Sequence, residues 1–251
     1  MFVRSTRGNP YHHPAGSPKG GQFAPKGKGN RVEYDDAHYE ERTAVRKRKH
    51  AERLVDLCRD RGIAISEEDI ESLCLMEVSD LSEYSTAVYL EPEISKSVLT
   101  TAGTLLGFEH RLKTPSSVLE KIKRKGRPVC KFYDILRYTA VLPPERYSSG
   151  VTDTLSQLKG KGYKVVKISN SWNNPNRAYN GVNVKLISPE GQNFELQFHT
   201  QESFDMKENE LHRLYEKQRR LKPSDPKFNA IERQMIAISR KVKKPKGVDL
   251  L

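Results

Sequence analysis

Two carboxylates lie inside short apolar runs of this chain, and they are the residues best placed to do chemistry. Asp134 falls in residues 132–137 (Phe-Tyr-Asp-Ile-Leu-Arg), and Glu195 falls in residues 194–199 (Phe-Glu-Leu-Gln-Phe-His). Runs of this composition predict β-strands, whose side chains alternate between two faces, so each acid points either into the core or into a cleft. Because a buried unpaired carboxylate is costly, we expect each acid to meet a cation or a substrate proton.

Basic residues are concentrated shortly before the first of these acids, at Arg111, Lys113 and Lys121 and in residues 123–125. Grouped cations of this kind suit a polyphosphate. Carboxylates that can hold magnesium, next to bases that can hold phosphates, indicate phosphoryl or nucleotidyl transfer. The plainer interpretations are that the lysines form a solvated helix face and that Asp134 pairs with a nearby arginine.

The second acid is followed at intervals of two by Gln197 and His199. Alternation along a strand places both on the same side as Glu195. This pattern fits either the solvent side of a half-exposed strand or the wall of a cleft. A histidine in such a position is more often structural than catalytic.

Local signals predict alternating strands and helices around these residues. We expect Thr114 to cap a helix that begins at Pro115 and ends at Gly126. The other elements expected in this half of the chain are strands at 108–113, 132–141 and 163–169, a hairpin of strands 183–188 and 193–199, and helices at 150–160, 202–221 and 226–243. The alternation, with its late hairpin, predicts an α/β (α+β) fold in which a mixed sheet is flanked by helices.

The N-terminal part of the chain differs in composition. Residues 1–31 hold six Lys/Arg and no acid, with many Gly and Pro, so we expect a disordered basic tail. Residues 32–105 are expected to be helical, with one helix stopping at Gly62, another starting at Ser66, and a break near Pro92. The expected segments are therefore 1–31, 32–105, 106–221 with the acids and bases, and 222–251 with a C-terminal helix and tail.

Charge and composition limit the class of protein. A net charge of +12 over 251 residues favours a polyanionic partner such as a nucleotide, a nucleic acid or an anionic surface. The three cysteines share no metal-ligand spacing, which is typical of free thiols in a reducing compartment. No apolar run approaches the roughly 20 residues that a membrane span needs, and the first residues lack the apolar core of a secretion signal. We therefore expect a cytoplasmic protein without membrane contact.

Five short motifs follow one another over about 110 residues. They are 111–117 (Arg-Leu-Lys-Thr-Pro-Ser-Ser) with Lys121 after it, 134–137 (Asp-Ile-Leu-Arg), 179–183 (Tyr-Asn-Gly-Val-Asn), 195–200 (Glu-Leu-Gln-Phe-His-Thr) and 212–216 (His-Arg-Leu-Tyr-Glu). In this order they resemble the synthetase domain of the RelA/SpoT family of pyrophosphokinases, in a compact single-domain form. The other half of the chain is not covered by the resemblance.

The resemblance implies a fold related to the polymerase-β-like nucleotidyltransferases. It also implies a reaction, transfer of the β,γ-pyrophosphate of ATP to the 3′-hydroxyl of a nucleotide. In that reaction Asp134 would hold Mg²⁺, and Glu195 would share the metal or take the proton of the attacking hydroxyl. The residues that the resemblance assigns to ATP are Arg111, Lys113, Lys121 and Arg124, with Ser117 as a hydroxyl contact.

On the acceptor side the resemblance points to Tyr179, stacked on the acceptor base, with Asn183, Gln197 and His199 nearby. The long housekeeping enzymes of the family have a tyrosine directly after the Asn-Gly pair. Here Val182 stands at that place and Tyr179 precedes the pair, as in small toxin-like members. Three kinds of acceptor stay open: GDP or GTP, an adenine nucleotide, or the 3′ end of tRNA.

The physiological expectations follow from the same resemblance. The sequence lacks the His-Asp metal pattern of the hydrolase domain that accompanies many family members, so we expect a growth-inhibiting toxin in a bacterial cytoplasm, with an antitoxin or inhibitory partner. The Gly/Pro/Lys-rich start is similar to tails of phage head-associated proteins and hints at a phage or prophage origin. Two alternatives stay open: a nucleotidyltransferase, and a phage structural or nucleic-acid-binding protein with an inactive domain.

Overall fold

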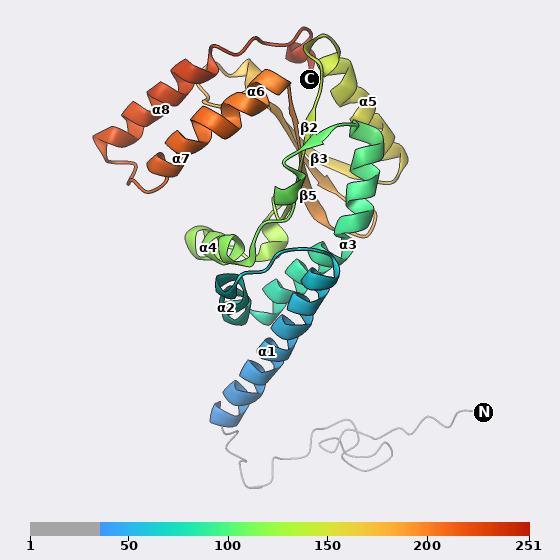
Figure 1. The fold of residues 1–251 in the computed structure, drawn as a ribbon, viewed down its shortest axis with the longest axis vertical. Coiled ribbons are helices and arrows are strands. Elements are labelled where there is room, and N and C mark those ends of the chain that lie inside the picture. Colours follow the sequence, from blue (N-terminus) through green and yellow to red (C-terminus); the bar gives the residue numbers. More distant parts are fainter. Residues whose placement is uncertain (1–35) are drawn as a thin grey trace, which may run out of the picture. The chain divides into compact units, whose positions relative to one another are not determined.

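The structure, a computed structural model, describes residues 36–251 and contains one sheet with helices on both sides (Figure 1). The expected basic tail at residues 1–31 lies outside the described residues. The helices are α1 (Asp36–Asp60), α2 (Glu67–Leu75), α3 (Val78–Ala102), α4 (Pro115–Lys125), α5 (Tyr147–Gly160), α6 (Gln201–Met206), α7 (His212–Gln218) and α8 (Pro226–Ser239). The strands are β1 (Leu105–Leu106), β2 (Leu136–Val141), β3 (Lys164–Asn170), β4 (Val182–Ile187) and β5 (Asn193–His199).

Residues 46–251 form one compact unit built around this sheet. The strand order is β1-β2-β5-β4-β3, with β2 and β5 parallel and the other pairs antiparallel. The expected mixed sheet flanked by helices is therefore confirmed, as is the hairpin of β4 and β5. Because β2 and β5 are parallel neighbours, Asp134, just before β2, and Glu195, near the start of β5, lie at the same end of the sheet. No helix within residues 36–251 has the length and apolarity needed to cross a membrane.

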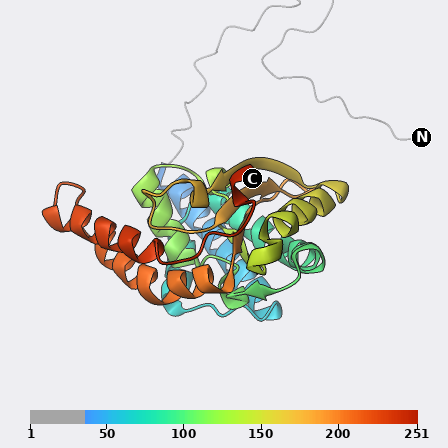
Figure 2. The same cartoon turned by 90° about the horizontal axis from the view of Figure 1, so that it is seen from above.

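The two faces of the sheet differ in composition. One face is apolar and buried, and it packs against α3 and α5; it consists of Leu136, Tyr138, Ala140, Val182, Val184, Leu186, Phe194, Leu196 and Phe198. Strand alternation and the register of the pairs place the polar side chains on the other face. This polar face consists of Arg137, Thr139, Asn183, Lys185, Glu195, Gln197 and His199. Figure 1 shows α6, α7 and α8 on this side of the sheet, and both views show α7 and α8 side by side (Figures 1 and 2).

Two helix starts near the candidate site form as their sequence signals predict. Ser66 caps α2, and its side chain exchanges hydrogen bonds with Asp69 in a capping box. Thr114 caps α4, Pro115 is the first residue of that helix, and Gly126 ends it with a φ of 59°. These local devices set the position of α4 beside the sheet.

The strand expected at residues 108–113 is wrong. The chain forms the two-residue strand β1 before this point, Gly107 then takes a φ of 60°, and a 3₁₀ turn follows at Phe108–His110. A left-handed residue interrupts an extended strand, so only an isolated bridge from Leu112 to Leu136 remains.

The strand expected from residue 132 is also shorter than predicted. A 3₁₀ turn occupies Val129–Lys131, and β2 begins only at Leu136. Asp134 therefore lies in the loop before the strand, where two lysines bind its carboxylate. Glu195 lies within a strand, as predicted.

The break expected near Pro92 is wrong, whereas the helix expected after β5 is confirmed. Helix α3 runs through Pro92 without a break, because residues on both sides of the proline, such as Val88 and Ile94, are buried in the core. Packing of this face outweighs the lost backbone hydrogen bond. The helix expected at 202–221 is present over residues 201–218, and it contains a π-helical turn at Lys207–Leu211. Such turns occur often at functional sites.

Candidate active site

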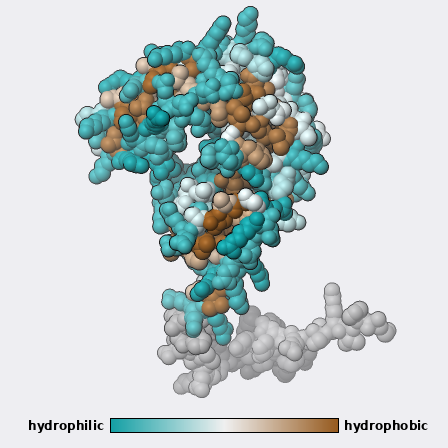
Figure 3. All heavy atoms as spheres, in the orientation of Figure 1, coloured by the Kyte–Doolittle hydropathy of each residue, from teal (hydrophilic) through white to brown (hydrophobic). Residues whose placement is uncertain are grey.

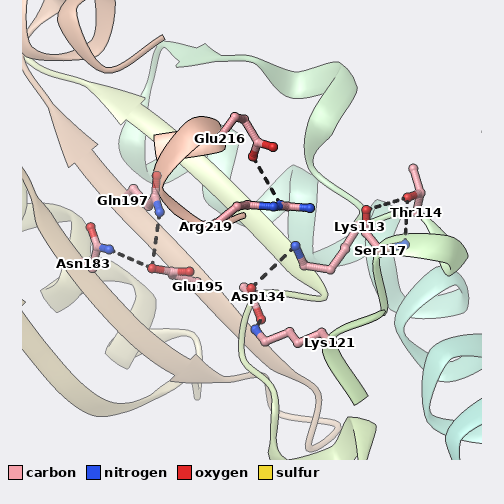
Figure 4. Close-up of polar contacts among 10 residues, drawn as sticks. All are labelled: Lys113, Thr114, Ser117, Lys121, Asp134, Asn183, Glu195, Gln197, Glu216 and Arg219. Carbon is pink, nitrogen blue, oxygen red and sulfur yellow. Dashed lines mark hydrogen bonds and ion pairs between the residues drawn. The ribbon is translucent and has the colours of Figure 1, made fainter. Parts of the chain in front are cut away.

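Asp134 lies in a cluster of charges between α4 and the start of β2. Its carboxylate forms an ion pair with Lys121 of α4, and its other oxygen lies 3.7 Å from the Nζ of Lys113 (Figure 4). Each of the three side chains is about one-fifth exposed. The ammonium of Lys121 also lies 4.6 Å from the centre of the Phe132 ring, a cation–π contact that helps to hold it in place.

The protonation of this cluster follows from its surroundings. Burial alone would raise the pKa of Asp134, but the hydrogen bond from Lys121 and the charge of Lys113 more than offset it, so that pKa lies below its ordinary value. Burial is also the main cause that lowers the pKa of Lys113, against the opposing effect of Asp134. Asp134 is therefore ionised at neutral pH, and a carboxylate in that state can bind a divalent cation.

Helix α4 presents its other predicted site residues at the surface. Ser117 accepts a hydrogen bond of 3.0 Å from the Thr114 hydroxyl (Figure 4) and is exposed, and Arg124 is exposed one turn after Lys121. The backbone at the start of α4 is already occupied, because the Ser116 N–H donates to Asp69 of α2 at 3.0 Å. A phosphate beside α4 would therefore be bound by side chains and not by the helix end.

Arg111 is placed differently from the other predicted ATP-binding residues. Its guanidinium makes two hydrogen bonds to Glu91 of α3, one of them 3.3 Å between Nη2 and Oε2. It also stacks on the Phe108 ring at 4.3 Å and donates from Nη1 to the Phe108 carbonyl. Glu91 is 3% exposed, so Arg111 neutralises a buried carboxylate inside the fold.

Glu195 is held on the polar face by two amides. Its Oε1 accepts hydrogen bonds from Asn183 Nδ2 at 2.9 Å and from Gln197 Nε2 at 3.3 Å (Figure 4). No hydrogen bond from the residues that the structure describes reaches its Oε2. Within the same part of the chain, the buried Oε1 of Gln197 also has no hydrogen-bond partner. The carboxylate is thus fixed through one oxygen and free to interact through the other.

Tyr179 and His199 lie next to this carboxylate but interact mainly with each other. The Tyr179 hydroxyl lies 2.5 Å from Asn183 Oδ1 and 2.8 Å from His199 Nε2, and the two rings meet edge to face. His199 is 0% exposed and its Nδ1 lies 2.9 Å from the Ser203 hydroxyl. Both imidazole nitrogens are therefore occupied inside the protein. The structure brings His199 to the site but keeps its side chain out of reach of a bound acceptor.

Two cations on this side of the sheet were not predicted as site residues. Arg137 pairs in register with Glu195, and its charge lowers the pKa of Lys113 and of His199. It therefore lies close to both the Asp134 cluster and the residues around Glu195. Lys207, in the π-helical turn, has a pKa lowered mainly by burial, and its Nζ binds Glu208 at 2.7 Å. Arg137 belongs to a quoted motif and follows Asp134 closely, whereas nothing in the sequence around Lys207 signals a site.

Arg219, just after α7, connects that helix to α4. Its guanidinium binds Glu216 of α7 at 3.2 Å and Glu120 of α4 at 3.3 Å. Figure 4 shows its side chain above Lys113, on the side away from Lys121. The space-filling view shows a hollow between α7 and α4 with a mainly hydrophilic surface (Figure 3). This ion pair was not predicted, because its partners lie 99 residues apart in the sequence.

The donor atoms of the site fit a magnesium ion that also binds substrate. Asp134 and Glu195 supply hard carboxylate oxygens, and the Oε2 of Glu195 accepts no hydrogen bond from residues 36–251. Among those residues no group of three or more His, Cys, Asp or Glu is arranged to hold a metal by itself. Magnesium is commonly bound by one or two carboxylates together with substrate phosphates, so two acids suffice.

Solved structures with a similar fold include three proteins at low sequence identity. The Type VI effector Tas1, crystallised in complex with its immunity protein, is 22% identical over 64% of this chain and 96% of that chain, with a TM-score of 0.48. The small alarmone synthetase 2 from Bacillus subtilis is 19% identical over 63% of this chain and 88% of that chain, with a TM-score of 0.45. A GTP pyrophosphokinase family protein from Streptococcus pneumoniae is 16% identical over 64% and 84%, also with a TM-score of 0.45.

The other comparisons give no match. No protein-family model matches the chain, and no curated protein matches it.

Proposed function

We propose that the chain is an ATP-dependent pyrophosphokinase. It transfers the β,γ-pyrophosphate of ATP to the 3′-hydroxyl of a nucleotide or of the tRNA 3′ end. The observation that carries the proposal is the pairing of two kinds of group at one end of the sheet. Asp134 is ionised between Lys113 and Lys121, and Glu195 beside it has one fixed and one free oxygen (Figure 4).

The bases and the acids of the site have separate tasks in this proposal. Lys113 and Lys121 bind the ATP phosphates as point charges, Asp134 would hold Mg²⁺, and the free oxygen of Glu195 is kept for the proton of the acceptor hydroxyl. The bound ion supplies neutralisation of the phosphate charge that builds up during transfer. Lys121 exchanges its ion pair with Asp134 for a phosphate, so the binding of ATP and of the cation are linked.

The transfer itself balances without a further reactant. The acceptor 3′-oxygen forms a bond to the β-phosphorus, the bond from that phosphorus to the α,β-bridging oxygen breaks, and AMP leaves. The hydroxyl proton passes to the free oxygen of Glu195. Alignment and charge neutralisation contribute more to such a step than covalent help from the protein.

A basic stripe on α1 favours an RNA acceptor over a free nucleotide. Arg46, Lys49 and Arg53 recur at helical spacing and line a hollow of about 330 Å³ together with His50, Ser85 and two leucines, without an acid. None of the three arginine or lysine side chains is paired with an acid among the described residues, whereas Arg48 binds Glu52. Unpaired cations at helical spacing suit a phosphate backbone.

The test offers each acceptor separately. Purified protein is incubated with Mg²⁺ and γ-³²P-ATP together with GDP, GTP, ATP or bulk tRNA, and the products are separated by thin-layer chromatography and denaturing gel. The proposal predicts label on one acceptor class, AMP as the other product, and no transfer by Asp134→Asn. Absence of both transfer and ATP binding in a folded protein would instead support an inactive domain in a structural or nucleic-acid-binding protein.

A toxic role is the physiological part of the proposal. Depletion of a nucleotide pool or of charged tRNA stops growth, so expression of the wild type should arrest a bacterial culture and Asp134→Asn should not. The immunity protein bound to Tas1 is a precedent for an inhibitory partner of such a fold. A co-expressed inhibitor of this chain should restore growth.

A further inference from the structure

Five side chains form a continuous row of hydrogen bonds that ends on the candidate catalytic carboxylate. The row runs from Ser203 through His199, Tyr179 and Asn183 to Glu195, with successive distances of 2.9, 2.8, 2.5 and 2.9 Å. It joins the 179–183 and 195–200 motifs and reaches the start of α6, where Ser203 belongs to the capping box of Thr200. We call these five residues the Glu195 network.

The charge of Glu195 determines the direction of the hydrogen bonds from Asn183 through Tyr179 to His199. A carboxylate only accepts, so Asn183 must turn its NH₂ toward Glu195 and its Oδ1 toward Tyr179. The Tyr179 hydroxyl must then donate to that Oδ1. Because the tyrosine has only one proton, the Nε2 of His199 must be protonated and donate to the Tyr179 oxygen.

The surroundings of His199 agree with this assignment. The side chain is fully buried, and burial is the main cause that lowers its pKa to about 3, with further lowering by Lys207 and Arg137. The ring is therefore neutral at physiological pH. With the proton on Nε2, its Nδ1 is an acceptor 2.9 Å from the Ser203 hydroxyl, which also lies within donating distance of the Thr200 carbonyl at 3.1 Å.

Gly181 shows that the space around the network is filled. A Cβ added at this position would lie 3.0 Å from His199 Cε1, 3.0 Å from the Tyr179 hydroxyl oxygen and 3.1 Å from the Phe198 carbonyl oxygen. The last of these atoms is backbone and cannot turn away. Any residue larger than glycine would therefore push on the hydrogen bond between Tyr179 and His199, so three residues of the 179–183 motif serve one network.

We propose that Tyr179 and His199 are positioning residues, which hold the Asn183 amide so that it fixes Oε1 of Glu195 and leaves Oε2 free for the reaction. The inference rests on the proposed function for the role of Glu195. It gives the Tyr179 hydroxyl a task inside the protein, in contrast to the base stacking that the family resemblance implies for the tyrosine ring.

Replacement of Tyr179 separates the two roles. Tyr179→Phe keeps the ring and removes the hydroxyl, and it should lower kcat by about tenfold or more while the KM for ATP stays within about twofold. A ring that only stacks on the acceptor predicts the opposite: an unchanged kcat in Tyr179→Phe and a raised acceptor KM in Tyr179→Leu. Tyr89→Phe is the matched control, because it removes the same group from an exposed tyrosine on α3.

Variants of His199 and Gly181 test the network from two other points. His199→Gln retains a donor for Tyr179 and should keep more of the kcat than His199→Leu, which removes it. Gly181→Ala changes no polar group, yet it should lower kcat as Tyr179→Phe does. Equal activity of the two His199 variants, or a fully active Gly181→Ala, would overturn the proposal.

A measurement of the imidazole itself keeps the inference separate from the proposed activity. In full-length protein labelled with ¹⁵N-histidine, the resonances missing from His199→Gln identify this ring. At pH 6.5 they should report a neutral ring with the proton on Nε2, and the Nε2 resonance should shift in Tyr179→Phe. A ring protonated only on Nδ1, or a doubly protonated ring, contradicts the network. A wild type without transfer to any acceptor contradicts the proposed function. The His199 resonances still test the hydrogen-bond directions of the Glu195 network in that case.

Discussion

Lys121 on α4 and Asp134 in the loop before β2 form an ion pair that joins the helix to the end of the sheet. The pair links a base suited to phosphate with an acid suited to a metal. A second base, Lys113, places its Nζ 3.7 Å from Asp134 Oδ2. In the proposed function, binding of ATP and a cation exchanges this internal ion pair for one contact with a phosphate and one with the metal. The ion pair keeps both side chains in place when no ligand is bound.

Loss of the Lys121 ammonium should affect ATP more than folding. Lys121→Met keeps most of the side-chain length, and we expect kcat/KM for ATP to fall about 100-fold, because the charge neutralises phosphate in the transition state. The free energy of unfolding should change by only about 1 kcal/mol, since the pair is partly solvated. ATP titrations and urea unfolding measure the two effects. Lys123→Met on the exposed side of α4 is the control, and equal ATP kinetics in both variants would contradict the assignment.

Arg111 should prove to be a structural residue. Arg111→Met leaves Glu91 buried without a cation, with only the Ser95 hydroxyl bound to its carboxylate, and we expect it to lower the free energy of unfolding by about 3–5 kcal/mol. The double variant Glu91→Met with Arg111→Met removes both charges and should recover most of this loss. Its KM for ATP should lie within about twofold of the wild type. A large rise in that KM in the stable double variant would restore the ATP-binding role that the motif implies.

The stability of the protein should fall at mildly acidic pH because of His199. Its pKa is about 3 in the folded protein against 6.5 as the ordinary value. Between these pH values the unfolded state therefore binds a proton that the folded state does not bind. This contribution is present in full above pH 6.5 and is lost progressively as the pH falls from 6.5 toward 3. It amounts to about 2 kcal/mol between pH 8 and pH 5. Urea unfolding at several pH values should show this slope in the wild type and a smaller one in His199→Gln; identical slopes would rule out the buried neutral ring.

The basic stripe on α1 should matter for an RNA acceptor only. Replacement of Arg46, Lys49 and Arg53 by glutamine should weaken transfer to tRNA by tenfold or more and reduce the salt dependence of tRNA binding by roughly 2–3 in the log–log slope. Transfer to a free nucleotide should not change. The control carries Arg48→Gln and Arg59→Gln, whose side chains are already paired with acids on α1. Equal losses in both variants would show that general charge, and not this stripe, binds the RNA.

The parts of the fold that could be predicted are those with local causes. The Thr114 cap, Pro115 and Gly126 define α4 by themselves, and the hairpin of β4 and β5 follows from alternating side chains around a turn. The strand expected at 108–113 failed because a single left-handed residue, Gly107, turns the chain before it. Propensity also favoured a break at Pro92, where burial of α3 in the core prevails.

Both acids and several bases of the candidate site were named from the sequence, but their contacts were not, and Arg137, Lys207 and Arg219 were missed. Spacing along β5 correctly placed Glu195, Gln197 and His199 on one face, because strand alternation is a local rule. Pairs such as Arg111 with Glu91 depend on how distant segments pack, so the motif alone suggested a ligand for the arginine where the fold supplies an acid. Burial of His199 is a property of the same kind, since Ser203 and Phe204 of α6 pack against the ring.

The most direct test of the central claim compares two labels of ATP in one reaction. Wild type and Asp134→Asn are incubated with Mg²⁺, the active acceptor, and either α-³²P-ATP or γ-³²P-ATP. A pyrophosphokinase places the γ label on the acceptor and releases the α label as AMP in equal amount, and Asp134→Asn does neither. Transfer of the α label to the acceptor with release of pyrophosphate would identify a nucleotidyltransferase and contradict the account.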